Sequence, residues 1–349
     1  MSKPIRILSI DGGGIRGVIP AMVLARLEEI TGKRIAEQFD LIAGTSTGGF
    51  MALLLAMPGH DKKPRYSAQE IVELYVKHGK DLFHRSPEYA KKSDNGSTLP
   101  KYPGSDVKKV FDLYFEKAEL KDTVTEVLVT AYDMDCRNLK LFISLNAYGD
   151  ENFYMSDVAR ATTAFPTIFP AVELTSVDGK KTLHCLDGGV GAINPSVQAL
   201  SMVLAAEPKA KIMLVSLGTG DYDKPLPFKE VEKWGMNLTP GKGWDPSTLM
   251  DVLFDGMNHA ASEAADWTIA SRGTCFRLQA RLCEALSPMD NTAPDHIELL
   301  QSVALEMIHK KDDQLQEIAS HLAESRGKGD RRAKRAASST RRAKRAASG

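Results

Sequence analysis

The stretch F-D-L-I-A-G-T-S-T-G-G-F-M-A-L-L-L-A-M, residues 39–57, decides the fold of this chain. Its first residues predict a buried strand, residues 44–48 a sharp turn, and the apolar residues that follow a helix. In this strand–turn–helix context, G-x-S-x-G is typical of a serine presented at the tip of a strained turn. Gly44 and Gly48 lack the side chains that would collide there, and Ser46 would stand before a helix N-terminus that favours negative charge. On this pentapeptide alone, two interpretations stay open: Ser46 as a nucleophile, or a small-residue connecting loop.

A second unit of the same kind precedes it. Residues 5–10 predict a strand, D-G-G-G-I-R-G follows at residues 11–17, and residues 18–30 have helical apolar spacing. Two such units predict an α/β fold with a parallel sheet. Further strands are expected at residues 127–132, 139–145, 182–186 and 211–217, and further helices at 68–83, 156–164 (capped by Ser156), 195–206, 247–271, 296–309 and 312–325. We see no separate second core, so residues 1–325 are expected to form one domain, with the helices of about 247–325 packed on its sheet.

Two segments are expected to lie outside the hydrophobic core. Residues 86–104 are polar and rich in turn formers, which predicts a long surface loop and leaves a mobile flap over the site as one option. Residues 326–349 hold ten Lys or Arg and one acidic residue. The rest of the chain holds 35 Lys or Arg and 44 Asp or Glu, so a tail of charge +9 follows a body of charge −9. R-R-A-K-R-A-A-S occurs in it twice, which indicates a disordered basic tail, an engineered segment, or a site for a basophilic kinase or an anionic membrane.

Composition and cysteine spacing argue against a membrane-spanning, a disulfide-rich or a metal-binding protein. The chain has 349 residues, 43% of them hydrophobic, and its longest apolar run is too short to span a bilayer. No leader pattern is seen, so a cytoplasmic protein is expected. The cysteines, Cys136, Cys185, Cys275 and Cys283, show neither metal-ligand spacing nor disulfide density, so reduced thiols and no metal site are expected.

The glycine block after the first strand has two interpretations. Gly12, Gly14 and Gly17 match the dinucleotide-binding spacing, but that motif calls for an acid at the end of the second strand, which here ends in the Ser46 turn. Alternatively, consecutive glycines leave backbone N–H groups free to form an oxyanion hole, with Arg16 adding positive charge.

Serine chemistry also needs a base. Of the histidines, only His184 lies in a strand that leads to a candidate site, whereas others fall in predicted helices. Asp187 is the stronger candidate, because it ends a predicted strand and two glycines follow it. An ordinary turn aspartate is its alternative interpretation.

At this point three separated motifs agree, and the sequence resembles the patatin-like phospholipase family. D-G-G-G-I-R-G, G-T-S-T-G and D-G-G at residues 187–189 match that family's oxyanion-hole, nucleophile and aspartate blocks, in order. The runs A-R-A-T-T-A-F-P-T-I-F-P, D-G-G-V-G-A-I-N-P and S-L-G-T-G also resemble its pattern. The resemblance covers about residues 5–220, and residues 221–325 carry no motif that we can match.

The resemblance implies a three-layer α/β/α sandwich with a mainly parallel central sheet. It implies Ser46 as nucleophile and Asp187 as general base without a histidine, an acyl-enzyme, and no cofactor or metal. The resemblance also implies that Gly12, Gly13 and Gly14 donate hydrogen bonds to the oxyanion and that Arg16 assists them. Burial beside Leu186 and Val190 would raise the pKa of Asp187 from its ordinary value of about 3.9.

The expected activity is phospholipase A-type hydrolysis of lipid esters at a membrane surface. No nucleic-acid partner is expected. Some bacterial relatives in the family are gated effectors, so an activating ligand or partner stays open. The alternatives are a nucleotide-binding oxidoreductase that uses the first glycine turn and a non-catalytic membrane-recruitment protein.

Overall fold

The computed structural model describes residues 3–222, 225–237, 239 and 243–323. Within these residues, eight strands form one mixed sheet in the order β5-β6-β3-β2-β1-β7-β9, with β4 also beside β3. Its strands are β1 (Ile5–Ile10), β2 (Leu41–Thr45), β3 (Glu126–Asp133), β4 (Asn138–Ile143), β5 (Val172–Thr175), β6 (Thr182–Asp187), β7 (Ile212–Leu217) and β9 (Gly273–Leu278). Two short strands, β8 (Asp221–Tyr222) and β10 (Arg281–Leu282), pair with each other.

The middle of the sheet is parallel. β1 pairs in parallel with β2 and β7, β2 with β3, and β7 with β9, so the carboxyl ends of these strands meet at one edge. The last residue of β1, Ile10, lies opposite Gly44 on one side and Leu217 on the other. β6 runs antiparallel to β3, and the register places Asp187 opposite Ala131. All the turns that carry the sequence motifs therefore reach the same edge.

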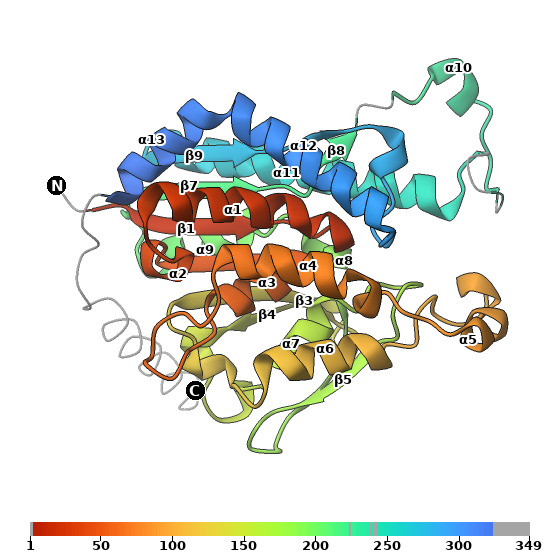
Figure 1. Cartoon of the computed structure of the whole chain (residues 1–349), viewed down its shortest axis with the longest axis horizontal. Coiled ribbons are helices and arrows are strands. Elements are labelled where there is room, and N and C mark those ends of the chain that lie inside the picture. Colours follow the sequence, from red (N-terminus) through yellow and green to blue (C-terminus); the bar gives the residue numbers. More distant parts are fainter. Residues whose placement is uncertain (1–2, 223–224, 238, 240–242, 324–349) are drawn as a thin grey trace.

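Helices cover both faces of this sheet (Figure 1). One face carries α1 (Val18–Thr31), α3 (Thr47–Leu55), α4 (Ala68–Leu82), α6 (Ser105–Phe115), α7 (Met155–Thr162), α12 (Pro294–Lys310) and α13 (Asp312–Ala323). The other carries α9 (Ser196–Ala206) and α11 (Pro246–Ile269). Short helices complete the set: α2 (Ile35–Gln38), α5 (Pro87–Lys92), α8 (Gly189–Ala192) and α10 (Phe228–Val231). The predicted three-layer α/β/α arrangement is confirmed.

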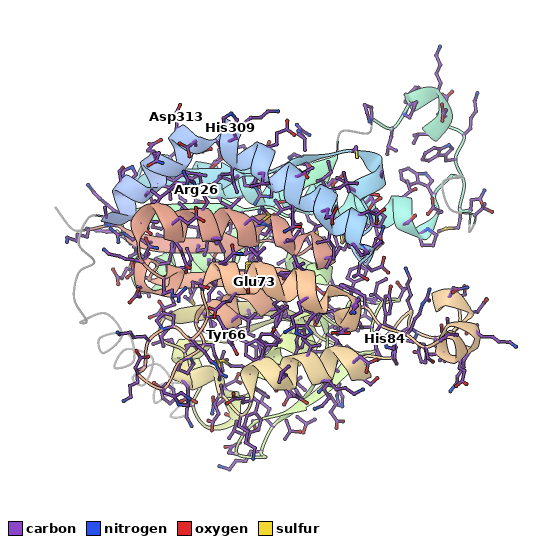
Figure 2. All side chains as sticks on the ribbon, in the orientation of Figure 1. Arg26, Tyr66, Glu73, His84, His309 and Asp313 are labelled. Carbon is purple, nitrogen blue, oxygen red and sulfur yellow. The ribbon has the colours of Figure 1, made fainter. Side chains whose placement is uncertain are left out.

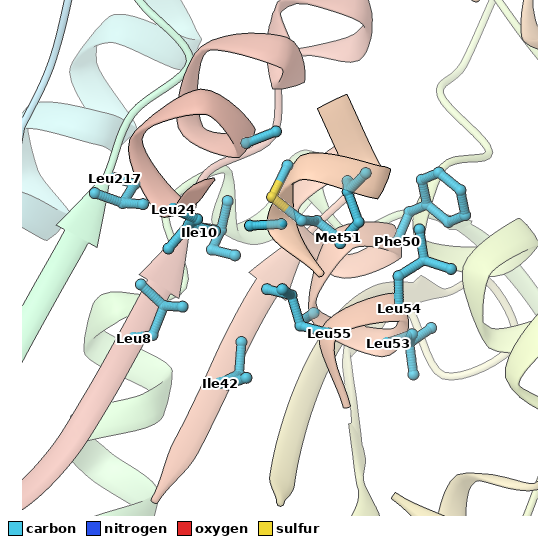
Figure 3. Close-up of a cluster of buried hydrophobic side chains, with 14 of the residues drawn as sticks. Leu8, Ile10, Leu24, Ile42, Phe50, Met51, Leu53, Leu54, Leu55 and Leu217 are labelled. Atoms are coloured by element: carbon cyan, nitrogen blue, oxygen red, sulfur yellow. The ribbon is translucent and has the colours of Figure 1, made fainter. Parts of the chain in front are cut away.

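Strand periodicity explains the two layers of core. Along β1, Leu8 and Ile10 join the larger cluster, while Ile5 and Ile7 join the cluster beneath α9 and α11. The helix after the serine turn is buried at every position, which fits its uniformly apolar sequence. Figure 3 shows its Met51 side chain in the same cluster as the β1 residues. This packing holds the start of α3 firmly behind the turn.

Helices α12 and α13 pack on α1, whereas α11 packs on α9 and β9. Arg26 of α1 lies at the junction of α12 and α13, near His309 and Asp313 (Figure 2). Its guanidinium pairs with Asp312 at 3.4 Å and with Glu29 at 3.2 Å. These are half-exposed pairs, so the apolar contacts beneath them contribute more to the docking.

Two local predictions were wrong. The expected loop at residues 86–104 contains α5, because Ser86 accepts a hydrogen bond from the N–H of Tyr89 and Pro87 follows it. Helix α7 begins at Met155 after an extended Tyr154, so Ser156 is inside the helix and is not its cap. In addition, the sequence predicts no element between the helices expected at 247–271 and 296–309, where β9 lies. The basic tail falls outside the described residues.

None of the helices in the described ranges is long and apolar enough to cross a bilayer.

Candidate active site

The turn between β2 and α3 places Ser46 in a strained conformation. Its φ of 54° and ψ of −124° are unusual for a residue with a side chain. A Cβ atom on Gly44 would lie 2.1 Å from the carbonyl oxygen of Gly48, and one on Gly48 would lie 2.2 Å from that of Ile10. The prediction that these glycines permit the close passage of strand and helix is confirmed.

Ser46 faces Asp187 directly. The Ser46 hydroxyl donates to Asp187 Oδ2 at 2.7 Å. The other carboxylate oxygen, Oδ1, accepts the N–H of Gly189 at 2.7 Å, and the Asp187 residue is only 1% exposed. The carboxylate is therefore oriented from both sides, with one oxygen reserved for the serine.

Burial sets the basicity of this carboxylate. It raises the pKa of Asp187 to about 7, while the hydrogen bonds from Ser46 and Gly189 act in the opposite direction. Desolvation disfavours the charged form of an acid, and here it outweighs those hydrogen bonds. An aspartate with such a pKa is a competent proton acceptor near neutral pH.

The glycine loop approaches the serine, but its members differ in what they offer. Gly12 donates its N–H to the carbonyl oxygen of Ile193 at 3.0 Å, and its own carbonyl oxygen accepts from Thr219 Oγ1 at 2.6 Å. This differs from the prediction, because the Gly12 N–H is already used. The N–H groups of Gly13 and Gly14 have no hydrogen-bond partner within the described part of the chain, and both residues line the cavity at Ser46.

Arg16 was expected to add positive charge at the oxyanion hole. The residue is 5% exposed and is not among the described residues that line the cavity. Burial lowers the pKa of His296, and the nearby charge of Arg16 lowers it further. The charge of Arg16 therefore acts on His296, which does not line the cavity within the described residues.

Ser46 and Asp187 stand in the wall of a large cavity. Its volume is about 700 Å³, and its lining is mostly apolar, including Phe50, Leu82, Phe83, Val107, Phe111, Phe165, Ile168, Phe169, Leu249, Met250 and Phe254. The charged residues that line it are acidic, namely Asp187, Asp251 and Asp290. Such a lining suits an extended hydrocarbon chain and an ester placed at the serine.

The other candidate residues lie elsewhere. His184 is exposed and contacts Asp135 and Glu173, so it is not part of this site. The described residues contain no cluster of His, Cys, Asp and Glu that would hold a metal ion.

Sequence reasoning missed two supporting hydroxyls. Thr162 Oγ1 accepts the N–H of Ser46 at 2.8 Å, and Thr219 holds Gly12. Both threonines lie in sequence runs that carry the family resemblance. The runs therefore marked these residues as part of the family pattern, but they did not indicate that the hydroxyls hold the serine turn and the glycine loop.

Several known proteins are similar to this chain. A family model described as patatin-like phospholipase matches residues 8–200. Patatin-like protein 2 of Arabidopsis thaliana is 28% identical over 88% of this chain and 83% of its own length. Patatin-2-Kuras 4 of Solanum tuberosum is also 28% identical, over 89% of this chain and 88% of its own. Among solved structures, human GIVD cytosolic phospholipase A2 aligns with 91% of this chain and 60% of that chain, at 9% identity and a TM-score of 0.39. The chain belongs to the patatin-like phospholipase family of lipid acyl hydrolases.

Proposed function

We propose that this enzyme hydrolyses the fatty-acyl esters of membrane phospholipids with Ser46 as nucleophile and Asp187 as general base. The observation that carries the proposal is the 2.7 Å hydrogen bond from Ser46 Oγ to a buried aspartate in the wall of an apolar cavity. A nucleophile within hydrogen-bond reach of an oriented base is the arrangement that covalent catalysis needs.

The steps follow from these positions. Asp187 takes the proton of the Ser46 hydroxyl as Oγ attacks the ester carbonyl carbon. The negative charge that develops on the carbonyl oxygen is stabilised by the N–H groups of Gly13 and Gly14. The tetrahedral intermediate then expels the lysolipid alkoxide, which receives the proton from Asp187. Water, deprotonated by Asp187, attacks the acyl-enzyme and releases the fatty acid with the free serine.

The dinucleotide-binding alternative is not supported. A Cβ atom on Gly12 would lie 3.2 Å from the Cβ of Ser46, so the glycine loop packs directly against the serine turn. We interpret its free N–H groups as donors to a small oxyanion at Ser46 rather than to a dinucleotide.

Peripheral action at a membrane is supported by the surface beside the cavity. Phe228 and Met236 are 76% and 73% exposed, and Leu253 of α11 is 50% exposed, one residue before the cavity-lining Phe254. Figure 1 shows α10 projecting from the same side of the molecule as the start of α11. Exposed apolar side chains on and near α11, which contributes to the cavity wall, suit insertion into a bilayer surface.

A serine-directed label tests the catalytic assignment. The protein is treated with a fluorophosphonate probe, the adduct is mapped by peptide mass spectrometry, and the products released from phosphatidylcholine vesicles are profiled. We expect labelling at Ser46, fatty acid and lysophospholipid as products, and neither labelling nor turnover in Ser46→Ala. Turnover retained by a folded Ser46→Ala protein would overturn the mechanism.

Membrane action is tested separately. Phe228→Asp and Leu253→Asp should weaken sedimentation with vesicles and slow vesicle hydrolysis, while hydrolysis of a soluble p-nitrophenyl ester stays unchanged. Leu305→Asp, at a leucine that is 58% exposed and does not line the cavity, is the matched control. Equal loss in the control would show that the surface beside the cavity has no special part.

A further inference from the structure

A buried ionic cluster lies behind the glycine loop. Arg277, from β9, is 20% exposed in its side chain, and its Nη2 lies 2.5 Å from Oδ2 of Asp11, whose side chain is 1% exposed. The same guanidinium donates from Nη1 to Ser216 Oγ at 2.8 Å and from Nη2 to Asn258 Oδ1 at 3.1 Å. One side chain thus joins β7, β9 and α11 to the residue that begins the loop.

Asp11 connects this cluster to the reaction centre. It immediately precedes Gly12 in the chain, and its N–H donates to the carbonyl oxygen of Leu217 at 3.0 Å. Gly13 then packs against the turn that follows β7, where a Cβ atom on it would lie 2.2 Å from Thr219 Oγ1. Gly14 continues with φ of 59°, a conformation that glycine adopts readily. The direction of the Gly13 and Gly14 N–H groups therefore depends on how the chain leaves Asp11.

Asp11 needs a counter-charge to stay in place. Burial raises its pKa, and the charge and hydrogen bond of Arg277 act against that rise. Its Oδ1 has no hydrogen-bond partner within the described residues, so the carboxylate is held through Oδ2. A buried carboxylate that loses its cation must take up a proton or move toward water, and either change releases the start of the loop.

We propose that Arg277 is a positioning residue for ester hydrolysis, which acts through Asp11 to hold the Gly13 and Gly14 N–H groups toward the oxyanion. The inference rests on the proposed function of Ser46 and the glycine loop. Arg277 lies beyond residues 8–200, the part that the family model matches.

The experiment compares Arg277→Gln, Arg277→Lys and Asp11→Asn with the wild-type enzyme on a soluble p-nitrophenyl ester. We expect Arg277→Gln and Asp11→Asn to lower kcat at least about tenfold with KM nearly unchanged, because loss of a single oxyanion donor costs about a hundredfold or more. Arg277→Lys keeps the charge but cannot bridge three acceptors in one plane, so it should restore part of kcat. Arg281→Gln, at a side chain that is 70% exposed, is the control and should leave both constants unchanged.

Inhibitor binding distinguishes positioning from general damage. A trifluoromethyl ketone, which forms an oxyanion at Ser46, should lose affinity by the same factor as kcat/KM, whereas a fatty-acid product should bind as before. The effects of Arg277→Gln and Asp11→Asn should also fail to add in the double variant, because both act through one contact.

The proposal is overturned if folded Arg277→Gln keeps a kcat within about twofold of wild type, a change well below the cost of one oxyanion donor. If Arg277→Gln does not fold, Asp11→Asn gives the same test, and unchanged kcat in that variant also overturns it. A wrong assignment of Ser46 would give a different result. In that case Ser46→Ala would keep its turnover both in the wild-type background and in the Arg277→Gln background.

Discussion

Ser46 Oγ lies 2.7 Å from Asp187 Oδ2, although 141 positions of the chain separate the two residues. The contact exists because β6 runs antiparallel to β3 and ends beside it, level with the serine turn. As the proposed base, Asp187 would reach Ser46 without an intervening histidine, and no histidine lines the cavity in the described residues. The behaviour of this pair with pH and mutation should reveal the mechanism.

The first prediction concerns the pH dependence of activity. The general base must be ionised to accept a proton, and burial raises the pKa of Asp187 to about 7. We therefore expect kcat/KM on a soluble ester to rise with pH, to be half-maximal near neutrality and to level off above it. The measurement is a profile from about pH 5 to about pH 9. A profile already flat near pH 5 would show that Asp187 titrates normally and contradict the assignment.

The second prediction concerns the stability of Asp187→Asn. The folded-state pKa of Asp187 lies above its ordinary value of 3.8, so the folded protein binds the proton more tightly than the unfolded chain. This contribution is fully present below the ordinary value and is lost as pH rises through the folded pKa. Asp187→Asn removes the ionisation, so it should raise the free energy of unfolding relative to wild type more at about pH 8 than at about pH 5.

Urea unfolding at the two pH values measures this difference. The same Asp187→Asn protein should have lost most of its esterase activity. A variant that is both inactive and less stable at the higher pH would indicate a damaged fold instead of a missing base.

The third prediction concerns the turn glycines. Gly44→Ala would place a Cβ atom 2.1 Å from the Gly48 carbonyl oxygen, and neither backbone segment has room to move. We expect a loss of about 3 kcal/mol or more in the free energy of unfolding, at the upper end of overpacking costs. Gly256→Ala is the control, because Gly256 lies within α11 and a Cβ there meets open space. That change should leave the protein as stable or raise stability by up to about 1 kcal/mol.

The fourth prediction concerns Thr162. Its hydroxyl accepts the N–H of Ser46 at 2.8 Å, so Thr162→Val leaves that donor unsatisfied beside the nucleophile. We expect a loss of about 1–3 kcal/mol in the free energy of unfolding, together with a lower kcat. Thr162→Ser keeps the hydroxyl and should retain most of both. Thr162→Val keeps the methyl group, so wild-type stability and kcat in that variant would show that the hydrogen bond has no part.

Much of this site was open to prediction because its motifs are local. The strand–turn–helix pattern around Ser46, the glycine block and the aspartate before two glycines are each defined by neighbours in the chain. Parallel strands bring such turns to one sheet edge, so the meeting of Ser46 and the loop follows from the fold class. The errors, such as the cap at Ser156 and the loop at residues 86–104, concern local hydrogen bonds that several nearby residues compete to make.

By itself, then, the sequence determined the three-layer class and the serine turn, and it singled out Asp187 as the candidate base. Only the tertiary structure decided which glycine N–H groups remain available, because Ile193 takes that of Gly12. It also decided the burial that raises the pKa of Asp187 and the position of Arg277 behind the loop. These properties depend on desolvation and on contacts between residues far apart in the chain, and neither leaves a periodic or local signal in the sequence.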